Sequence, residues 1–170
     1  GDLDLFNMLI NEINADDDLN YTDSNGRTLL YVAMISKNFE IIKALLVQYK
    51  VDPNIADNSG KKPFHIACEM KNVDVVDLFI NQSPSTIDIN EQYKEMTPIE
   101  IACNRGDFET VKLLLKQEGI IVNQSSKYDI PPLLCACEKW KPDIIKLLLK
   151  EVPDIDVNVS QSDGRRLLHY

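Results

Sequence analysis

The sequence repeats itself with a period of about 34 residues, and this period limits what the chain can fold into more than any other feature. Alanines recur at intervals of 34, 35 and 34 residues, at Ala33, Ala67, Ala102 and Ala136. Asparagines mark the ends of successive repeats, at Asn20, Asn54, Asn90, Asn123 and Asn158. A chain with such a period is expected to stack one short structural repeat on the next, so that each repeat contacts only its neighbours.

Each repeat shows the same local pattern of turn, helix, helix and loop. The turns at 23–26 and 57–60 combine Asp or Asn with Gly, which supplies the positive φ that a tight turn needs. Pro63 and Pro98 suit the first turn of a helix, where a missing N–H group is no loss. The second helix, as in residues 41–46, carries apolar side chains at helical spacing. Helices of about eight to ten residues are marginal alone, so we expect them to stack on their neighbours.

The composition is that of a folded, acidic chain. Of its 170 residues, 44% are hydrophobic, and the formal net charge is −9. A chain of this length can bury a proper core, and it lacks the apolar run of about 20 residues that a membrane-spanning helix needs. The net negative charge argues against general nucleic-acid binding, because a polyanion requires a basic surface.

The acidic residues are concentrated at the N-terminal end. Residues 1–26 carry seven of the 27 acidic residues and no basic residue. We interpret this segment as a solvated terminal surface, and the alternative is a docking surface for a basic partner. The first residues also lack the basic region and the long apolar stretch of a signal peptide. We therefore expect an intracellular protein, cytoplasmic or nuclear, with the cytoplasm favoured.

The sequence offers no arrangement of residues that is typical of an enzyme, a metal site or a cofactor site. Its four cysteines have no C-x-x-C spacing, and together with two histidines they form no ligand cluster. It contains no glycine-rich phosphate-binding motif. His65 and Cys68 stand at i and i+3 of one expected helix, which would suit a nucleophile and its base. We favour a structural role for both, and we predict no catalytic residue, no metal and no cofactor.

Two segments resemble the motifs of a known family. Residues 62–68, KPFHIAC, resemble the first-helix motif of the ankyrin repeat, and residues 106–115, GDFETVKLLL, resemble its second helix. The resemblance extends over the whole chain. It implies an all-α fold, an ankyrin-repeat solenoid of stacked helix-turn-helix pairs with β-turn or hairpin tips. It also implies that His65 is structural and that Cys68 is a small buried residue.

The recurring residues also give the expected boundaries. We expect a single ankyrin-repeat domain over residues 1–170, with a half repeat or cap at 1–20 and the start of a truncated fifth repeat at 159–170. The four full repeats are expected at 21–54, 55–90, 91–123 and 124–158. Because the fifth repeat stops within its first helix, we expect the chain to be part of a longer protein; a natural truncated cap is the alternative.

Several positions depart from the family pattern. The His of the first-helix motif is replaced by Tyr31, Glu100 and Leu134 in repeats one, three and four. Glu95 stands where repeat three should have its turn glycine, and Trp140 stands where repeat four should have a glycine between its two helices. In the family, the His and a Thr connect the turns of adjacent repeats by hydrogen bonds. We therefore expect looser turns where they are missing.

The resemblance implies a binding function on the concave surface that turn tips and first helices form. Residues outside the pattern are the informative ones there, because the pattern itself is needed for stacking. The anchor patch that we predict in repeats three and four consists of Tyr93, Met96, Tyr128, Ile130 and Trp140, joined by Met70, Lys94, Arg105 and Lys139. Aromatic residues, Met and Arg are enriched at the centres of interfaces. The alternative for Trp140 is local packing over the missing glycine.

We expect a non-enzymatic protein-protein interaction module that binds a partner protein through this surface. The alternative is a regulatory or targeting arm of a larger multidomain enzyme, channel or secreted effector, acting in cis. A ligand or RNA receptor is a third, weaker hypothesis, because it needs a basic pocket with stacking aromatic residues. We expect a monomer without membrane insertion. End-to-end association through the truncated repeat ends is the other option.

Overall fold

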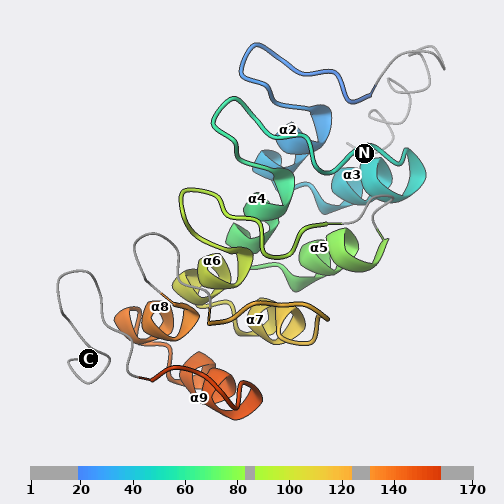
Figure 1. Ribbon diagram of the computed structural model, residues 1–170. Helices are drawn as coiled ribbons and strands as arrows, with labels where there is room; N and C mark the ends of the chain where they lie inside the picture. The colour runs from blue at the N-terminus through green and yellow to red at the C-terminus, as the bar shows by residue number, and fades with distance from the viewer. Residues whose placement is uncertain (1–18, 83–86, 124–130, 158–170) are drawn as a thin grey trace. The chain divides into compact units, whose positions relative to one another are not determined.

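The described part of the chain folds into pairs of short helices (Figure 1). The computed structural model describes residues 19–82, 87–123 and 131–157. The first helices of the pairs are α2 (Leu29–Ser36), α4 (Pro63–Glu69), α6 (Pro98–Arg105) and α8 (Pro132–Glu138). The second helices are α3 (Phe39–Lys43) continued by η1 (Ala44–Gln48), α5 (Val73–Asp77) continued by η2 (Leu78–Gln82), α7 (Phe108–Leu114) and α9 (Pro142–Glu151). These described residues contain no β-strand, which confirms the all-α prediction.

The chain divides into two compact units. Unit 1 consists of Gly1–Ala67 and Asp74–Ile87, and unit 2 consists of Cys68–Val73 and Asp88–Tyr170. Unit 1 therefore holds the first two helix pairs except for the end of α4 and the start of α5, and unit 2 holds the last two pairs. No helix in the described ranges is both long enough and apolar enough to cross a membrane.

The first helices begin at side-chain caps or at proline. Thr28 Oγ1 accepts a hydrogen bond from the N–H group of Tyr31, which satisfies one of the free N–H groups at the start of α2. Thr97 caps α6 in the same way, and the Glu100 carboxylate accepts from the N–H group of Thr97 at 2.6 Å, which completes a capping box. Pro132 stands in the first turn of α8. These local signals fix where each helix starts.

The second helices of unit 1 end in a wider turn than the sequence pattern predicts. In η1 the N–H group of Tyr49 donates to the carbonyl of Ala44, five residues earlier, at 3.0 Å. The η2 segment ends α5 in the same way. A π-helical turn of this kind continues the helix with a wider turn, and it rotates the side chains that follow around the helix axis.

Each unit is closed around its own apolar core. In unit 1 the rings of Phe64 and Phe79 lie 5.8 Å apart between their centres, and both side chains are buried. In unit 2 the fully buried side chains include Ile99, Leu114 and Leu148, one each from α6, α7 and α9. These positions are the ones that recur every 34 or 35 residues. The period of the sequence therefore marks the residues that repeats bury against their neighbours.

The recurring asparagines join one loop to the next. In unit 1 the Asn20 Oδ1 atom accepts a hydrogen bond from the N–H group of Asp52 at 2.7 Å. In unit 2 the Asn90 side chain donates to the carbonyl of Gly119 at 2.8 Å and accepts from the N–H group of Ile121 at 2.9 Å. Each bond satisfies backbone groups of the following loop, which explains why Asn recurs at these positions.

Tyr31 connects two successive turns of unit 1, although we expected looser turns where it replaces His. Its O–H group donates to the Asp57 carboxylate at 2.6 Å. Asn58 adds a second connection, because its side chain donates to the carbonyl of Ser24 at 3.0 Å. The expectation was wrong for this repeat, since a longer side chain with a terminal hydroxyl still reaches the next turn.

The same turn lowers the pKa of the Asp57 carboxyl group. Partial burial alone would raise the pKa of Asp57, but hydrogen bonds from Ser59, from Tyr31 and from the N–H groups of Lys61 and Ser59 outweigh it and lower this pKa to about 2. A lowered pKa means that the folded state favours the carboxylate. The resulting stabilisation is present above the ordinary pKa of 3.8 and is lost as pH falls toward 2.

We predict that Tyr31→Phe lowers the free energy of unfolding by about 1–2 kcal/mol at neutral pH, because a hydrogen bond to a charged group is lost. Urea unfolding followed by circular dichroism measures this change. Tyr21→Phe is the matched control, because the Tyr21 side chain is 81% exposed and should change stability little. The deficit of Tyr31→Phe should shrink between pH 4 and pH 2, where Asp57 becomes protonated. Equal stability of both variants at pH 7 would contradict the cross-turn bond.

Candidate functional site

The residues considered for nucleophilic chemistry are buried structural residues. His65 and Cys68 are at most 1% exposed, and His65 Nδ1 accepts a hydrogen bond from the N–H group of Lys62 at 3.1 Å. Burial raises the pKa of the Cys68 and Cys103 thiols far above the ordinary value, which keeps both protonated at neutral pH. Cys137, at the equivalent position of repeat four, is only half-buried. Among the described residues no His, Cys, Asp and Glu side chains gather as a metal site would require.

Glu100 is an acidic side chain inside the core of unit 2. It is 1% exposed, and its Oε1 atom has no hydrogen-bond partner, whereas Oε2 accepts from the N–H group of Thr97. Burial raises the pKa of Glu100, and the hydrogen bonds from Thr97 offset this only in part. The carboxylate therefore costs stability at neutral pH. The family pattern has His at this position.

The turn before α6 is a tight hairpin with strained backbone. Tyr93 and Met96 exchange two backbone hydrogen bonds, of 3.0 and 3.1 Å, across the turn. Lys94 and Glu95 at its tip have positive φ angles of 47° and 65°, a pair that usually requires Asn and Gly. The Lys94 Nζ atom lies 5.4 Å from the centre of the Tyr93 ring, within range of a cation–π interaction. The strained turn thus presents a base and an aromatic ring together.

A second row of predicted residues lies where the first helices end. We call residues 69–71, 105–106 and 139–141, all in unit 2, the helix-end row. One residue in each group has left-handed backbone, namely Lys71, Gly106 and Trp140, with φ angles of 56°, 68° and 50°. Lys37 of unit 1 has the same conformation at the end of α2. The chain needs this conformation to turn into the second helix, yet only one of the four residues is glycine.

Contacts within unit 2 join the helix-end row into one surface. The Arg105 guanidinium lies 3.7 Å from the Glu69 carboxylate, which connects the ends of α6 and α4. The side chain of Lys141 lies against the backbone of Gly106, so that a Cβ atom added there would clash with it. This contact connects the ends of α6 and α8, helices that also pack side by side (Figure 1).

Trp140 is the outstanding side chain of this row. It is 74% exposed, and Lys139 beside it is exposed as well. So large an exposed fraction leaves little of the indole to fill a gap between helices. Arg105 is also exposed, whereas Met70 is half-buried. The row thus combines an exposed aromatic ring with bases and a thioether, the residue types that carry binding energy at interfaces.

The structure places the predicted residues in two groups. Met70, Arg105, Lys139 and Trp140 belong to the helix-end row, and Tyr93, Lys94 and Met96 belong to the hairpin turn. Tyr128 and Ile130 lie outside the described residues. Whether the two groups act together as one patch stays a prediction.

Sequence reasoning missed two features of this region. It identified Trp140 as a departure from glycine but not Lys71, although Lys37, Lys71, Gly106 and Trp140 stand 34, 35 and 34 residues apart. Comparing that column would have shown three substitutions rather than one. The ion pair between Glu69 and Arg105 left no local signal, because it joins residues 36 positions apart.

Comparisons with known proteins agree with this architecture. Residues 1–93 and 83–163 match the family model of ankyrin repeats in three copies, so the chain belongs to the ankyrin repeat family. Ankyrin repeats are protein-interaction modules. The crystal structure of the ankyrin repeat domain of Bcl-3, a member of the IkappaB family, superposes with a TM-score of 0.77. That comparison has 25% identity and covers 98% of this chain and 71% of the Bcl-3 chain.

Two curated proteins are similar to this chain in sequence. The human SMC5-SMC6 complex localization factor protein 1 is 32% identical over 112 residues, which cover 65% of this chain and 10% of that protein. The mouse B-cell lymphoma 3 protein homolog is 27% identical over 169 residues, covering 98% of this chain and 36% of that protein. The chain therefore spans between a tenth and about a third of the length of these relatives.

We predict that Glu100→Gln raises the free energy of unfolding by about 1 kcal/mol at pH 7, because it removes a buried charge and keeps an acceptor for Thr97. The raised pKa of Glu100 means that its protonated form is favoured in the fold. The gain should therefore be absent below the ordinary pKa of 4.5 and appear as pH rises through the raised value. Glu109→Gln, an exposed change in α7, is the control. A gain that is the same at pH 4 and pH 7 would contradict this account.

Proposed function

We propose that the helix-end row binds a segment of a partner protein, with Trp140 as the apolar anchor and Arg105 as the principal polar contact. The protein acts in this proposal as a non-enzymatic interaction module. Family membership supports the general role, since ankyrin repeats are protein-interaction modules. The particular surface rests on the side chains of unit 2.

The observation that carries the proposal is the cost of keeping Trp140 where it is. A residue other than glycine in left-handed backbone loses about 1–2 kcal/mol, and the cost is higher for bulky side chains. The indole gains little from folding in return, because it is 74% exposed. Strained positions of this kind concentrate at functional sites, where another benefit offsets the strain. Contact with a partner would supply that benefit by burying the ring.

The neighbours of Trp140 suit the same role. The ion pair with Glu69 limits the freedom of the Arg105 side chain, which lowers the entropy that binding must remove. The Lys141 side chain lies against Gly106, which limits its freedom in the same way. The half-buried Met70 offers a polarizable contact that adapts to different side chains. A partner segment with an apolar side chain next to a carboxylate would match this arrangement.

The cis-acting arm remains the second candidate. The curated relatives are much longer than the part this chain matches, 10% of the human protein and 36% of the mouse protein. In such proteins the matching repeats are one part among others, and the helix-end row would then bind a segment of the same polypeptide. An intracellular location stays a prediction in either case.

We predict that Trp140→Gly stabilises the fold and abolishes partner binding. Relief of the left-handed strain, less the flexibility that glycine adds to the unfolded chain, should raise the free energy of unfolding by about 0.5–1 kcal/mol. Urea unfolding measures this gain. A pull-down from a lysate of the source cells, with the native chain and the variant as baits, measures binding.

Lys37→Gly is the matched control for this pair of measurements. It relieves the same strain at the end of α2 but lies outside the helix-end row, so it should be stabilised and should retain the partner. A protein kept by the native chain and by Lys37→Gly, and lost by Trp140→Gly, supports the proposal. Equal recovery on all three baits would contradict it. A partner protein that binds the Trp140→Gly variant more tightly than the native chain would also contradict it.

A further inference from the structure

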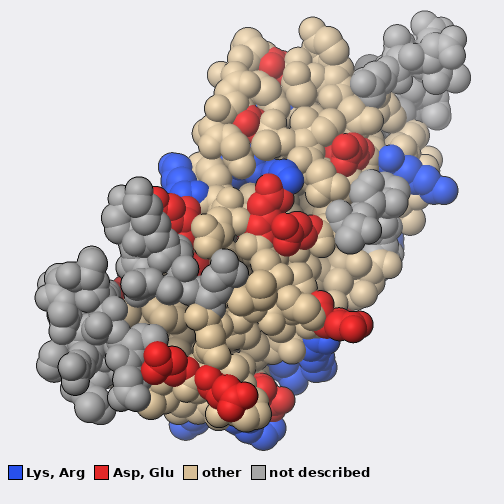
Figure 2. All heavy atoms as spheres, viewed as in Figure 1, with Lys and Arg blue, Asp and Glu red and all other residues tan. Residues whose placement is uncertain are grey.

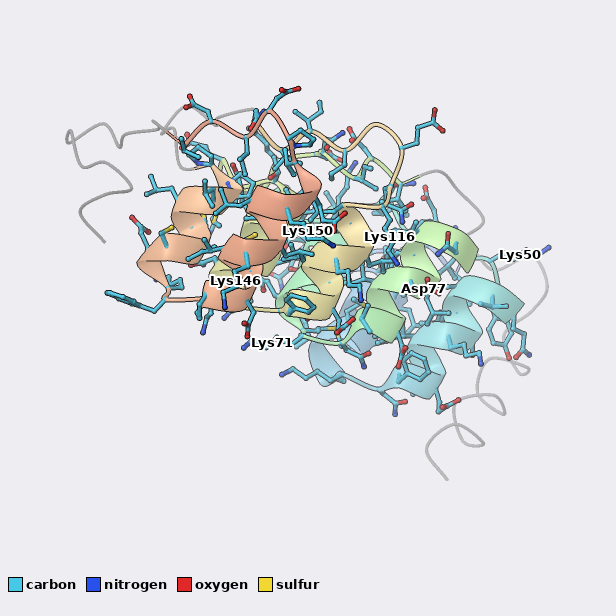
Figure 3. The ribbon with its side chains drawn as sticks, turned by 90° about the horizontal axis from the view of Figure 1, so that it is seen from below. Lys50, Lys71, Asp77, Lys116, Lys146 and Lys150 are labelled. Atoms are coloured by element: carbon cyan, nitrogen blue, oxygen red, sulfur yellow. The ribbon has the colours of Figure 1, made fainter. Side chains whose placement is uncertain are left out.

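The second helices of unit 2 carry a regular array of basic side chains. Lys112 stands in the last turn of α7 and Lys116 just after the helix ends, whereas Lys146 and Lys150, 34 residues later, stand one turn apart in α9. We call these four residues the lysine grid. The two helices pack side by side (Figure 1), and Figure 3 shows Lys146 and Lys150 along α9 with Lys116 near the end of α7. All four side chains are exposed.

Charges of the grid from both helices lower the pKa of one carboxylate, that of Glu151. The Lys150 Nζ atom lies 2.8 Å from the Glu151 carboxylate. This hydrogen bond lowers the pKa of Glu151, and the charges of Lys150, Lys116 and Lys112 lower it further, which shows that lysines from both helices lie close to the same carboxylate. Three of the four lysines thus act on a single acid, and the grid as a whole keeps an excess of positive charge.

The repeat itself does not require lysine at these positions. The residues of unit 1 that correspond to Lys112 and Lys146 are Lys43 and Asp77, and those that correspond to Lys116 and Lys150 are Val47 and Asn81. Basic residues in the last turn do complement the helix dipole, but this is worth only about 0.3–1 kcal/mol each. Asp77 shows that the fold also accepts the opposite charge there. The grid is therefore specific to unit 2, and the stacking of repeats does not require it.

The surroundings of the grid favour an acidic occupant that also carries apolar side chains. Leu149 borders Lys146 and Lys150 and is 48% exposed. Figure 2 shows basic side chains at the edge where Figure 1 places α7 and α9, with acidic side chains on the adjoining front face. Acidic side chains on that face would repel a polyanion as extended as a nucleic acid, and Asp154 and Asp156 in the loop after α9 are exposed as well. A short acidic peptide meets less of this repulsion.

This sequence contains such a peptide. Residues 1–18 carry six acidic and no basic residues, with the run Asp16–Asp18 at their end, and they include apolar residues such as Leu3 and Phe6. We propose that the lysine grid binds residues 1–18 of a second copy of the chain. The contact is heterologous, since one surface meets a different one, so it leaves a free grid and a free acidic segment for further copies.

Sedimentation velocity of the full chain over a range of concentrations tests this proposal. At about 0.05 M NaCl the weight-average sedimentation coefficient should rise with concentration, and at about 0.5 M NaCl it should stay at the monomer value, because salt screens exposed charges. The double variant Lys112→Glu/Lys146→Glu should weaken association at least about tenfold at low salt. Lys43→Glu, at the equivalent position of unit 1, is the control and should associate like the native chain.

Charge exchange separates this contact from a general effect of charge. The triple variant Asp16→Lys/Asp17→Lys/Asp18→Lys should also lose association, and a chain that carries both sets of substitutions should regain it. Recovery in the combined variant supports the proposal. A chain that is monomeric at every concentration and salt overturns it, and so does association that survives reversal of the grid or that Lys43→Glu weakens equally. Circular dichroism of each variant confirms that it is folded.

Discussion

The helices of this protein are shorter than helices that hold their structure alone in water, and contacts between successive repeats make up the difference. The described helices have between five and ten residues, whereas isolated helices of fewer than about 12 residues are marginal. Burial of the recurring apolar positions supplies the main stabilisation. Hydrogen bonds that Tyr31 and Asn90 donate, and one that Asn20 accepts, add the direct connections from one loop or turn to the next.

This dependence divides the sequence into two kinds of position. Positions that face a neighbouring repeat are restricted, and there even an unfavourable residue such as Glu100 is held in the core by its capping bonds. Positions at helix ends and on outer faces are free of that restriction. The lysine grid and the Trp140 indole do not face a neighbouring repeat, although the backbone at Trp140 is left-handed, so these side chains are open to selection for binding. Because ankyrin repeats as a family bind proteins, the departures from the pattern carry the information about this member.

Most of the fold could be predicted from the sequence, because the residues that form and stack the helices recur in every repeat. The helix pairs could be predicted from the period and the apolar stretches. The family could be predicted from the first-helix motif of residues 62–68. The π-helical ends at η1 and η2 could not be predicted, since they depend on how the last turn meets its neighbour. The bond from Tyr31 to Asp57 was missed because a replacement for His was taken as a loss, although its hydroxyl reaches the same turn. Of the candidate site, the sequence identified the residues, but their exposure and the contact of Lys141 with Gly106 required coordinates.

Native-state hydrogen exchange of Asn90→Ala tests most directly whether contacts between repeats hold these helices. Asn90 bonds the loop of the following repeat at Gly119 and Ile121 and lies outside every helix. The account predicts faster exchange at the Ile121 N–H group and also at the N–H groups of Val111 in α7 and of Leu115 at its C-cap, which the substitution does not touch. Faster exchange at Ile121 with unchanged protection throughout α7 would contradict it, because the helix would then be stable without its connection to the preceding repeat.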